Sequence, residues 1–236
     1  MHLGDGERGV LPLVAAAHEL KSPLALLRQL LLQLQSTTLR PAEKAVLIER
    51  AILTSERGLR LTSDVTKAAR LEDALFTLEP INPEQLCLDI VTELQPLFAA
   101  HGKTMTVKSR RHPLLLVANR DLLRRIVVGF SDNALRYSGE NTAVELQIQA
   151  FKNAGTVRLG VRDYGPALSS DMWRTLQKKL RTSPQSVHAR PESSGLGLYI
   201  ASQFAEVMGG RIGAVRHRDG ATFYVELQAS TQTSLL

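Results

Sequence analysis

The chain has 236 residues, 44% of them apolar, which is enough to fill folded cores and excludes a disordered or fibrous protein. Its formal net charge of +6 leaves nucleic acid, anionic lipid, a phosphorylated ligand and an acidic protein open as partners. The single cysteine, Cys87, excludes an intrachain disulfide and a zinc site made of cysteines, and no apolar run approaches the roughly 18 to 20 residues that span a bilayer.

The first predicted element is a helix that carries a heptad seam. Its apolar residues are spaced alternately by four and three positions, the pattern of a helix that packs along one stripe. Pro23 lies within this run and costs about 3 kcal/mol in a helix interior. Each buried seam leucine contributes roughly 1.5 to 3 kcal/mol, so we expect the helix to continue through Pro23. The seam consists of Leu13, Ala17, Leu20, Leu24, Leu27, Leu31 and Leu34.

A second helix is predicted after a break at residues 36–40. Pro41, with Glu43 close behind it, is typical of a first helical turn, and helical spacing continues to about Leu71. Two helices joined by a short loop form a hairpin, but two amphipathic helices cannot enclose a core on all sides. We therefore predict that two copies of the hairpin form a dimeric four-helix bundle.

The periodicity changes near Pro80 and Pro83, which indicates a domain boundary. Beyond it, helical and strand-like segments alternate, as in helices layered on a mixed sheet. The predicted fold class is α+β, with an N-terminal two-helix hairpin at 1–74, a linker at 75–82, an α/β sandwich domain at 83–229 and a tail at 230–236. The expected helices are 84–100, 121–137, 170–180 and one that begins after 195–198, and the expected strands are 105–109, 114–118, 144–150, 156–161, 212–216 and 222–227.

His18 follows the seam residue Ala17, so we expect its side chain to lie beside the seam and to reach water. Glu19 is its neighbour, and Ser22 falls on the same helix face one turn later. A neutral imidazole beside a carboxylate can act as a nucleophile toward phosphorus. A solvated surface histidine has the same local sequence, so this segment alone leaves both interpretations open.

A polar cluster ends the predicted helix 121–137. Asp132 and Asn133 are followed by Arg136 and Tyr137, which together offer an oxygen ligand for a metal, a cation for phosphate and a flat ring for a base. A magnesium nucleotide needs these residue types. The alternative is a helix C-terminus with a favourably placed arginine.

Two glycine-containing segments follow the predicted sheet strands. Asp163 comes at a strand end, just before Gly165 and Pro166, where its carboxylate could accept the exocyclic amine of adenine; a simple turn has the same pattern. Residues 195–198, Gly-Leu-Gly-Leu, precede a helical run and place backbone N–H groups where phosphate is favoured, although glycines at a helix start also serve packing. The cationic segment 177–194 suits a lid over a nucleotide or a solvated loop.

In this order the segments resemble the transmitter core of the sensor histidine kinases of two-component systems. The residues 18–24, His-Glu-Leu-Lys-Ser-Pro-Leu, resemble the H box, and 132–138, Asp-Asn-Ala-Leu-Arg-Tyr-Ser, the end of the N box. Residues 163–166, Asp-Tyr-Gly-Pro, resemble the G1 box and 195–198 the G2 box. Residues 220–223, Gly-Ala-Thr-Phe, resemble the closing strand signature.

The resemblance implies a dimerisation and histidine phosphotransfer hairpin followed by a Bergerat-type ATP-binding domain, with ATP and Mg²⁺ as cofactors. It implies that His18 is phosphorylated from ATP, in trans or in cis, and that the phosphoryl group passes to an aspartate of a response regulator. By the same resemblance Glu19 is the base, and Ser22 stands where relatives carry a threonine used in dephosphorylation of the regulator. The implied nucleotide site comprises Asn133 for Mg²⁺, Arg136 for phosphate, Tyr137 beside the base, Asp163 for adenine, and Gly165, Gly195, Leu196, Gly197 and Leu198 as the glycine boxes.

Besides Ser22, two positions of the ATP-binding motifs depart from the family pattern. Gly129 stands where the N box usually has its first asparagine, and Ala167 stands where the G1 box usually has a second glycine. They motivate an alternative function, a degenerate scaffold that holds nucleotide and binds a response regulator without turnover. A nucleic-acid-binding protein rests only on net charge, because aromatic residues are 5% and no reader motif occurs.

The resemblance further implies a homodimer that binds a response regulator receiver domain and no nucleic acid. It implies a cytoplasmic location, either of the whole protein or of the cytoplasmic part of an inner-membrane sensor whose sensory part lies outside this chain.

Overall fold

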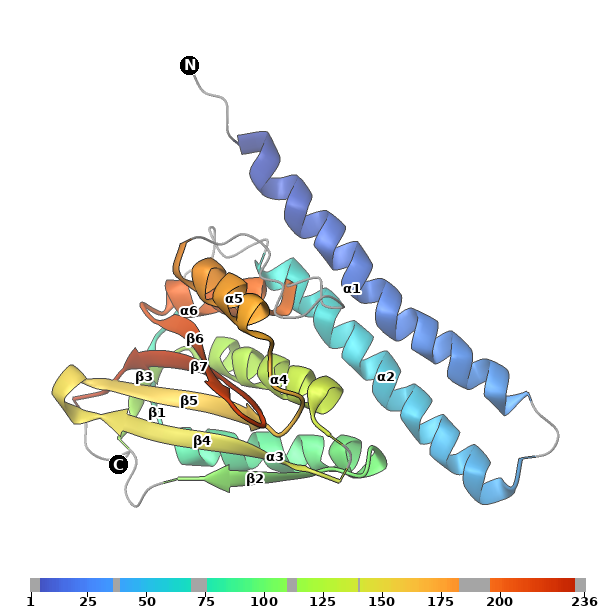
Figure 1. The fold of residues 1–236 in the computed structure, drawn as a ribbon. Helices are drawn as coiled ribbons and strands as arrows, with labels where there is room; N and C mark the ends of the chain where they lie inside the picture. The colour runs from blue at the N-terminus through green and yellow to red at the C-terminus, as the bar shows by residue number, and fades with distance from the viewer. Residues whose placement is uncertain are drawn as a thin grey trace.

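The computed structural model describes residues 5–35, 39–68, 76–109, 114–139, 141–182 and 196–231, with the side chains of 5–19, 67–68, 179, 181–182 and 196 outside the description. Two parts are visible in Figure 1: a pair of long antiparallel helices, and a twisted sheet with helices layered against it. The N-terminal part of the first helix extends away from the rest of the chain.

The helical pair consists of α1 (Asp5–Leu34) and α2 (Pro41–Ala68), which pack against each other along their length. As predicted, α1 continues through Pro23 and α2 begins at Pro41. The start of α2 is fastened by Glu43, whose carboxylate accepts a hydrogen bond of 2.9 Å from the backbone N–H of Arg40. Several apolar side chains of this hairpin stay exposed within one chain, namely Leu24, Leu31, Leu32, Val46, Ile48, Ile52 and Leu59.

The second part is built on a five-stranded sheet in the order β2-β4-β5-β7-β6. Its first two strands, β2 and β4, are parallel, and the other neighbours are antiparallel, so the predicted mixed sheet is confirmed. The strands are β2 (Thr104–Lys108), β4 (Ala143–Phe151), β5 (Thr156–Asp163), β6 (Arg211–His217) and β7 (Gly220–Gln228). A separate antiparallel pair joins β1 (Glu79–Ile81) to β3 (Leu116–Ala118).

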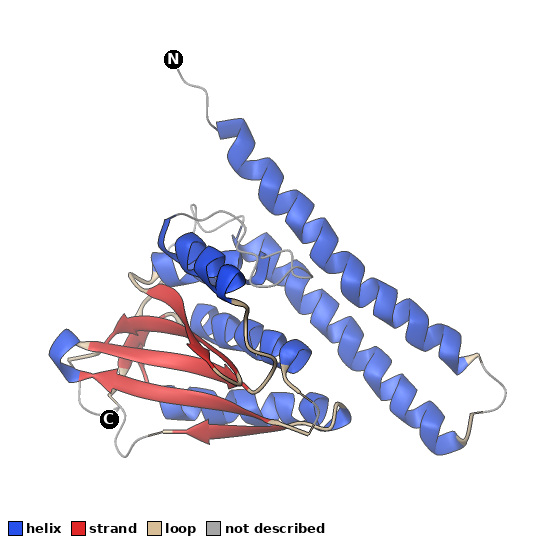
Figure 2. Cartoon of the chain, viewed as in Figure 1, coloured by secondary structure: helices blue, strands red, loops and turns tan. Residues whose placement is uncertain are grey.

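Helices gather on one side of this sheet, as Figure 2 shows. They are α3 (Pro83–Ala100), α4 (Arg120–Tyr137) and α6 (Leu196–Val207), while α5 (Ser170–Thr182) contacts β6. The core forms between them because alternate strand residues, such as Val157, Leu159 and Val161 of β5, point inward and are buried. Burial of each such side chain contributes roughly 1.5 to 3 kcal/mol. Phe130 of α4 meets Phe223 of β7 at a ring-centroid distance of 6.1 Å, which joins the helical layer to the sheet.

The element boundaries follow the sequence expectations closely, with three differences. Residues 79–81, inside the expected linker 75–82, form β1, and Ile81 is buried there. The helix after the glycine segment begins at Leu196, so Gly197 belongs to its first turn. In the expected tail, Ser230 donates a backbone hydrogen bond of 2.7 Å to the carbonyl of Leu115.

Part of the expected cationic lid, residues 183–194, lies outside the described residues. A search of the described helices for one that is both long enough and apolar enough to cross a bilayer finds none.

Candidate functional site

The site is organised around the C-terminal end of α4. The helix is anchored at its start by Asn119, whose side chain accepts a hydrogen bond of 3.1 Å from the N–H of Leu122. At the other end, the Nζ of buried Lys103 donates to the carbonyls of Leu135 at 2.6 Å and Ser138 at 2.9 Å. A helix end leaves its last carbonyls without helical partners, and a cation satisfies them well. Lys103 therefore fixes the turn that carries Asn133, Arg136 and Tyr137.

The turn after β5 is locked to this helix end. The backbone N–H of Gly139 donates to the carbonyl of Tyr164 at 3.0 Å. Gly165 lies so close to α4 that a Cβ on it would come within 2.1 Å of the carbonyl oxygen of Tyr137. Only glycine allows this approach. The predicted G1 segment and the end of the predicted N box therefore form one rigid unit.

Asp163 ends β5 with only 4% of its surface exposed. The N–H of Ala221 on β7 lies 3.4 Å from its Oδ1. Gly220, at φ +131°, packs against the same residue, since a Cβ there would lie 2.2 Å from the carbonyl oxygen of Asp163. A buried carboxylate that binds a ligand selects for a hydrogen-bond donor, because a ligand without a donor leaves the carboxylate unpaired.

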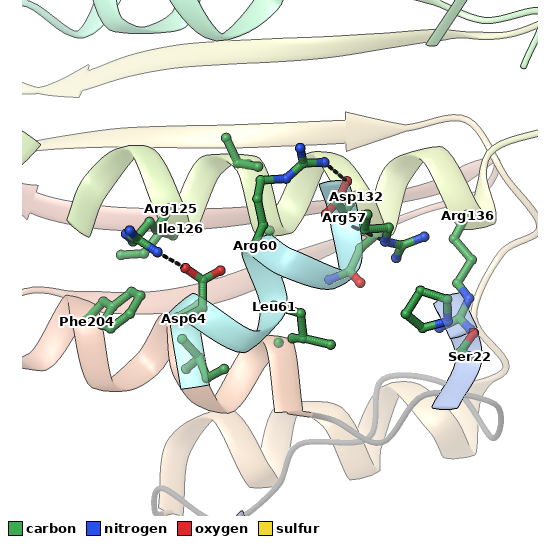
Figure 3. A pocket seen from close by; sticks show the side chains of 17 residues that line it. Ser22, Arg57, Arg60, Leu61, Asp64, Arg125, Ile126, Asp132, Arg136 and Phe204 are labelled. Carbon is green, nitrogen blue, oxygen red and sulfur yellow. Dashed lines mark hydrogen bonds and ion pairs between the residues drawn. The ribbon is translucent and has the colours of Figure 1, made fainter. Parts of the chain in front are cut away.

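A pocket lies between the helical hairpin and the sheet domain (Figure 3). The sheet domain contributes Gly129, Asp132, Asn133, Arg136 and Gly197, and the hairpin contributes Ser22 and Pro23. A Cβ on Gly129 or on Gly197 would meet no atom of the described part of the chain within 4 Å. Protein packing therefore does not require glycine at either position, which leaves the backbone open to a ligand.

Charged side chains join the two sides of this pocket in a complementary pattern (Figure 3). From α2, Arg57 and Arg60 approach the carboxylate of Asp132 on α4 at 3.7 and 3.9 Å, and Asp64 accepts a hydrogen bond from Arg125. Burial raises the pKa of the Asp64 carboxyl above its ordinary value, and the contact with Arg125 offsets this only in part.

A hydrogen bond of 2.9 Å also links the hairpin to the sheet domain, from the Nη2 of Arg136 to the Oγ of Ser22. Ser22 lies one turn after His18 on α1, about 6 Å along the helix axis. The backbone of His18 is therefore placed near the end of α4.

The structure brings together many of the residues predicted from the sequence. Ser22, Asn133, Arg136 and Gly197 line the pocket. Tyr137, Asp163 and Gly165 lie against one another at the end of α4 but do not line this pocket. Leu198 is buried in the core, so its side chain contributes packing rather than ligand contact. The side chains of His18, Glu19 and Leu196, and the whole of Gly195, lie outside the described residues.

Several residues of this region escaped the sequence analysis. They are Arg57, Arg60 and Asp64 of α2, Arg125 of α4 and Lys103 at the start of β2. The spacing of three and four between the α2 residues is a helical charge stripe, which could have indicated a charged face. Its partners on α4, Arg125 and Asp132, have no local signal, because they lie about 60 to 75 residues away in the sequence.

No group of three or more His, Cys, Asp and Glu side chains that could hold a metal ion occurs among the described residues. A cation that binds together with a nucleotide needs only one or two protein ligands plus phosphate oxygens. The amide of Asn133, which lines the pocket, is a suitable oxygen donor of this kind.

The sheet domain matches a known family. A family model described as histidine kinase-, DNA gyrase B- and HSP90-like ATPase covers residues 118–231. Among curated proteins, the sensor protein GacS of Pseudomonas syringae pv. syringae is 29% identical over 223 residues, or 90% of this chain. The histidine protein kinase SaeS of Staphylococcus epidermidis is 25% identical over 192 residues, or 80% of this chain. The chain spans only 24% of the length of GacS and 54% of that of SaeS.

Solved structures share the fold. The histidine kinase AdeS of Acinetobacter baumannii aligns with a TM-score of 0.59 at 15% identity, covering 91% of this chain and 98% of that one. ShkA, solved full-length in complex with AMPPNP, aligns with a TM-score of 0.60 at 24% identity, covering 95% of this chain and 47% of ShkA. ThkA, in complex with the response regulator protein TrrA, aligns with a TM-score of 0.58 at 16% identity, covering 91% of this chain and 60% of that one.

Proposed function

Because this chain contains a sensor histidine kinase ATPase domain, we propose that it is the kinase core of a two-component system. It transfers the γ-phosphoryl group of ATP to His18 and then to an aspartate of a response regulator. The observation that carries this proposal is the hydrogen bond between Arg136 and Ser22, which joins the predicted N box to the predicted H box across one pocket.

In the first step a nitrogen of the His18 imidazole attacks the γ-phosphorus, and the bond from that phosphorus to the bridging oxygen of ADP breaks. Glu19 orients the ring and takes its proton. In the second step the aspartate carboxylate of the regulator attacks the same phosphorus, and the nitrogen–phosphorus bond breaks. Both steps depend on positioning and charge neutralisation.

In this proposal, different residues of the ATPase domain bind the base, the phosphates and the metal ion of the nucleotide. Asp163 accepts the amine of adenine and Tyr137 flanks the base. Arg136 and the backbone at Gly197 face the phosphates, and Gly195 with Leu196 would complete that backbone turn. Mg²⁺ would neutralise phosphate charge when bound, and Asn133 would hold it through the amide oxygen. No atom of the described residues lies within 4 Å of a Cβ built on Gly197, which supports its proposed place next to a ligand.

We further propose the division into a phosphotransfer hairpin at 1–74, a linker at 75–82, a catalytic domain at 83–229 and a tail at 230–236. The exposed leucines and isoleucines of α1 and α2 support a homodimer, because Leu24 is 63% exposed and Leu59 68% exposed within a single chain. Large apolar side chains exposed in such number on one helical pair favour a partner that covers them. Two hairpins would then form a four-helix bundle.

The proposed partner is the receiver domain of a response regulator, and the complex of ThkA with TrrA supports this choice by analogy of fold. The complex of ShkA with AMPPNP supports ATP in the same way. The relatives GacS and SaeS are longer than this chain. The proposed location is the cytoplasm, either for a whole protein or for the cytoplasmic part of a longer inner-membrane sensor.

Transfer to a receiver domain tests the function as a whole. The chain is incubated with γ-labelled ATP and Mg²⁺, separated from free nucleotide, and mixed with a panel of receiver domains and their Asp→Ala variants. We expect label to leave the chain and appear on one receiver with an intact aspartate. Retained nucleotide binding without label on the chain or on any receiver would instead establish the scaffold alternative. A Ser22→Ala variant, assayed for release of phosphate from that receiver, tests the additional phosphatase role of Ser22.

A further inference from the structure

We propose that Arg162 is a positioning residue that aims the Asp163 carboxylate and thereby sets the preference for adenine over guanine. This inference rests on the proposed nucleotide site. It adds a residue that contacts no part of the ligand and acts on Asp163 through the backbone.

Arg162 is an arginine in a buried place, with 5% of its surface exposed. Its guanidinium donates to the backbone carbonyl of Asp163, to the carboxylate of Asp219 at 2.5 Å, and toward the carbonyl of Asp219 at 3.4 Å. It also lies over the ring of Tyr164, with its Cζ 4.2 Å from the ring centroid. The planar guanidinium can serve these partners together because its donors are held in a fixed fork.

These contacts connect the end of β5 to the turn between β6 and β7. Asp219 belongs to that turn, and its neighbour Gly220 packs directly against Asp163. Successive strand residues point to opposite faces of a sheet, so Arg162 holds the peptide from the outer face while the Asp163 side chain points inward. With the Asp163 carbonyl held by Arg162 and its Oδ1 near the N–H of Ala221, the carboxylate has little freedom to turn.

The direction of this carboxylate decides which base is accepted. Adenine presents an amine where guanine presents a carbonyl, and a fixed acceptor favours the first and opposes the second. A site built around one buried hydrogen bond discriminates strongly because the wrong ligand leaves its polar groups unpaired. A carboxylate free to rotate would lose affinity for adenine and relax the discrimination.

The same strand offers a matched control. Arg158 lies four residues earlier on β5, forms an ion pair of 2.7 Å with Glu226 and stacks over Tyr224 at 3.8 Å. Its interactions are of the same kinds as those of Arg162, but Glu226 and Tyr224 lie away from Asp163 in the strand register. Replacement of Arg158 therefore removes an outer-face ion pair and a ring contact without touching the nucleotide site.

The test is isothermal titration of the whole chain with Mg-ADP and with Mg-GDP. The variants are Arg162→Met, Asp219→Asn and Arg158→Met, each first checked for cooperative thermal unfolding. We expect Arg162→Met to lower ADP affinity by about tenfold while GDP affinity stays the same or rises, so that the ADP-to-GDP ratio falls. Asp219→Asn should shift the ratio in the same direction by a smaller factor, and Arg158→Met should leave it unchanged.

A ratio that stays at the wild-type value in both Arg162→Met and Asp219→Asn overturns the inference, as does an equal fall in Arg158→Met. If Arg162→Met does not fold, Asp219→Asn decides alone, because the Asp219 side chain is 66% exposed and its loss should not unfold the domain. Absence of ADP binding by the wild-type chain would overturn the proposed function itself, together with this inference. The two failures are therefore distinguishable.

Discussion

The guanidinium of Arg136 at the end of α4 donates a hydrogen bond of 2.9 Å to the hydroxyl of Ser22 on α1. This contact, together with the pairs between α2 and α4, holds the ATPase domain against the hairpin one helical turn from His18. In the proposed nucleotide site, the phosphates and Ser22 would be alternative partners for the same arginine. Release of Arg136 from the hairpin should therefore accompany productive nucleotide binding.

The pair between Asp64 and Arg125 should hold the hairpin and the ATPase domain together. Asp64→Arg and Arg125→Asp each place like charges in contact in a partly buried position, so each alone should separate the two parts and increase the radius of gyration in small-angle scattering. The double variant restores the pair and should return the radius to the wild-type value, with a coupling of about 1 kcal/mol in unfolding experiments.

A matched control is Asp171→Arg, which reverses one charge of a pair on α5 whose two side chains are 89% and 78% exposed. It should change neither scattering nor stability. Single variants of the Asp64–Arg125 pair that scatter like the wild type would show that this pair does not hold the two parts together.

The two glycines at the site should behave differently when replaced by alanine. Gly165→Ala forces a Cβ against the carbonyl of Tyr137 and should lower the free energy of unfolding by about 1 to 3 kcal/mol. The Cβ of Gly197→Ala meets no atom of the described residues within 4 Å, so this variant should change stability by less than about 1 kcal/mol yet weaken nucleotide binding. Chemical denaturation and nucleotide titration measure both effects. Undiminished nucleotide affinity in Gly197→Ala would mean that this glycine does not adjoin the ligand.

Gly129→Asn should strengthen Mg-dependent nucleotide binding several-fold. The position lies one turn before Asn133 on α4 and lines the same pocket, and a Cβ there meets no atom of the described residues within 4 Å. Helix propensity favours asparagine over glycine by a few tenths of a kcal/mol, so the variant should fold. Gly129→Ala is the control, because it gains propensity without an amide. An equal gain in both variants would attribute the effect to the helix and not to the metal.

Stability should depend on His217 at mildly acidic pH. Burial, and the neighbouring charge of Arg162, lower the pKa of His217 below 6.5. At His217 the unfolded chain then binds a proton more readily than the folded chain. The free energy of unfolding is therefore unaffected by this histidine above pH 6.5 and falls as the pH drops below 6.5. His217→Gln removes the titrating group. The melting temperatures of wild type and variant, measured from pH 7.5 to about 5, should diverge, with the wild type losing more. Parallel curves would contradict this.

The sequence predicted the elements that have strong periodicity or strong boundary residues. The helical spacing of α1, Pro41 at the start of α2 and the alternation in β5 are local patterns, and each was found as the expected element. Burial of the seam itself stays a prediction, because Leu24 and Leu31 are exposed in the single chain. The motif residues Asn133, Arg136 and Asp163 were found because the family resemblance orders them along the chain. The structure then placed them at one end of α4 and β5.

What escaped prediction depends on contacts between distant segments. The strand β1 has only three residues, the middle one a proline, and it pairs only because β3 lies beside it after folding. The cap that Lys103 provides for α4 spans more than 30 positions. Arg162 occupies an outward-facing position of β5, where a solvent-exposed side chain would be expected. In the folded protein it is buried and donates a hydrogen bond to Asp219, in the turn between β6 and β7. No local pattern marks such residues.

The most direct test of the proposed function is incubation of the chain with γ-labelled ATP and Mg²⁺, in parallel with the His18→Gln variant, followed by treatment of the labelled protein with acid. We predict that the wild-type chain takes up label that acid removes, as a phosphorus–nitrogen bond requires, and that the variant takes up none while it binds a fluorescent ATP analogue as tightly as the wild type. Acid-stable label, or label that persists in His18→Gln, would contradict phosphorylation of His18. No label on a wild-type chain that binds the analogue would contradict the kinase activity itself.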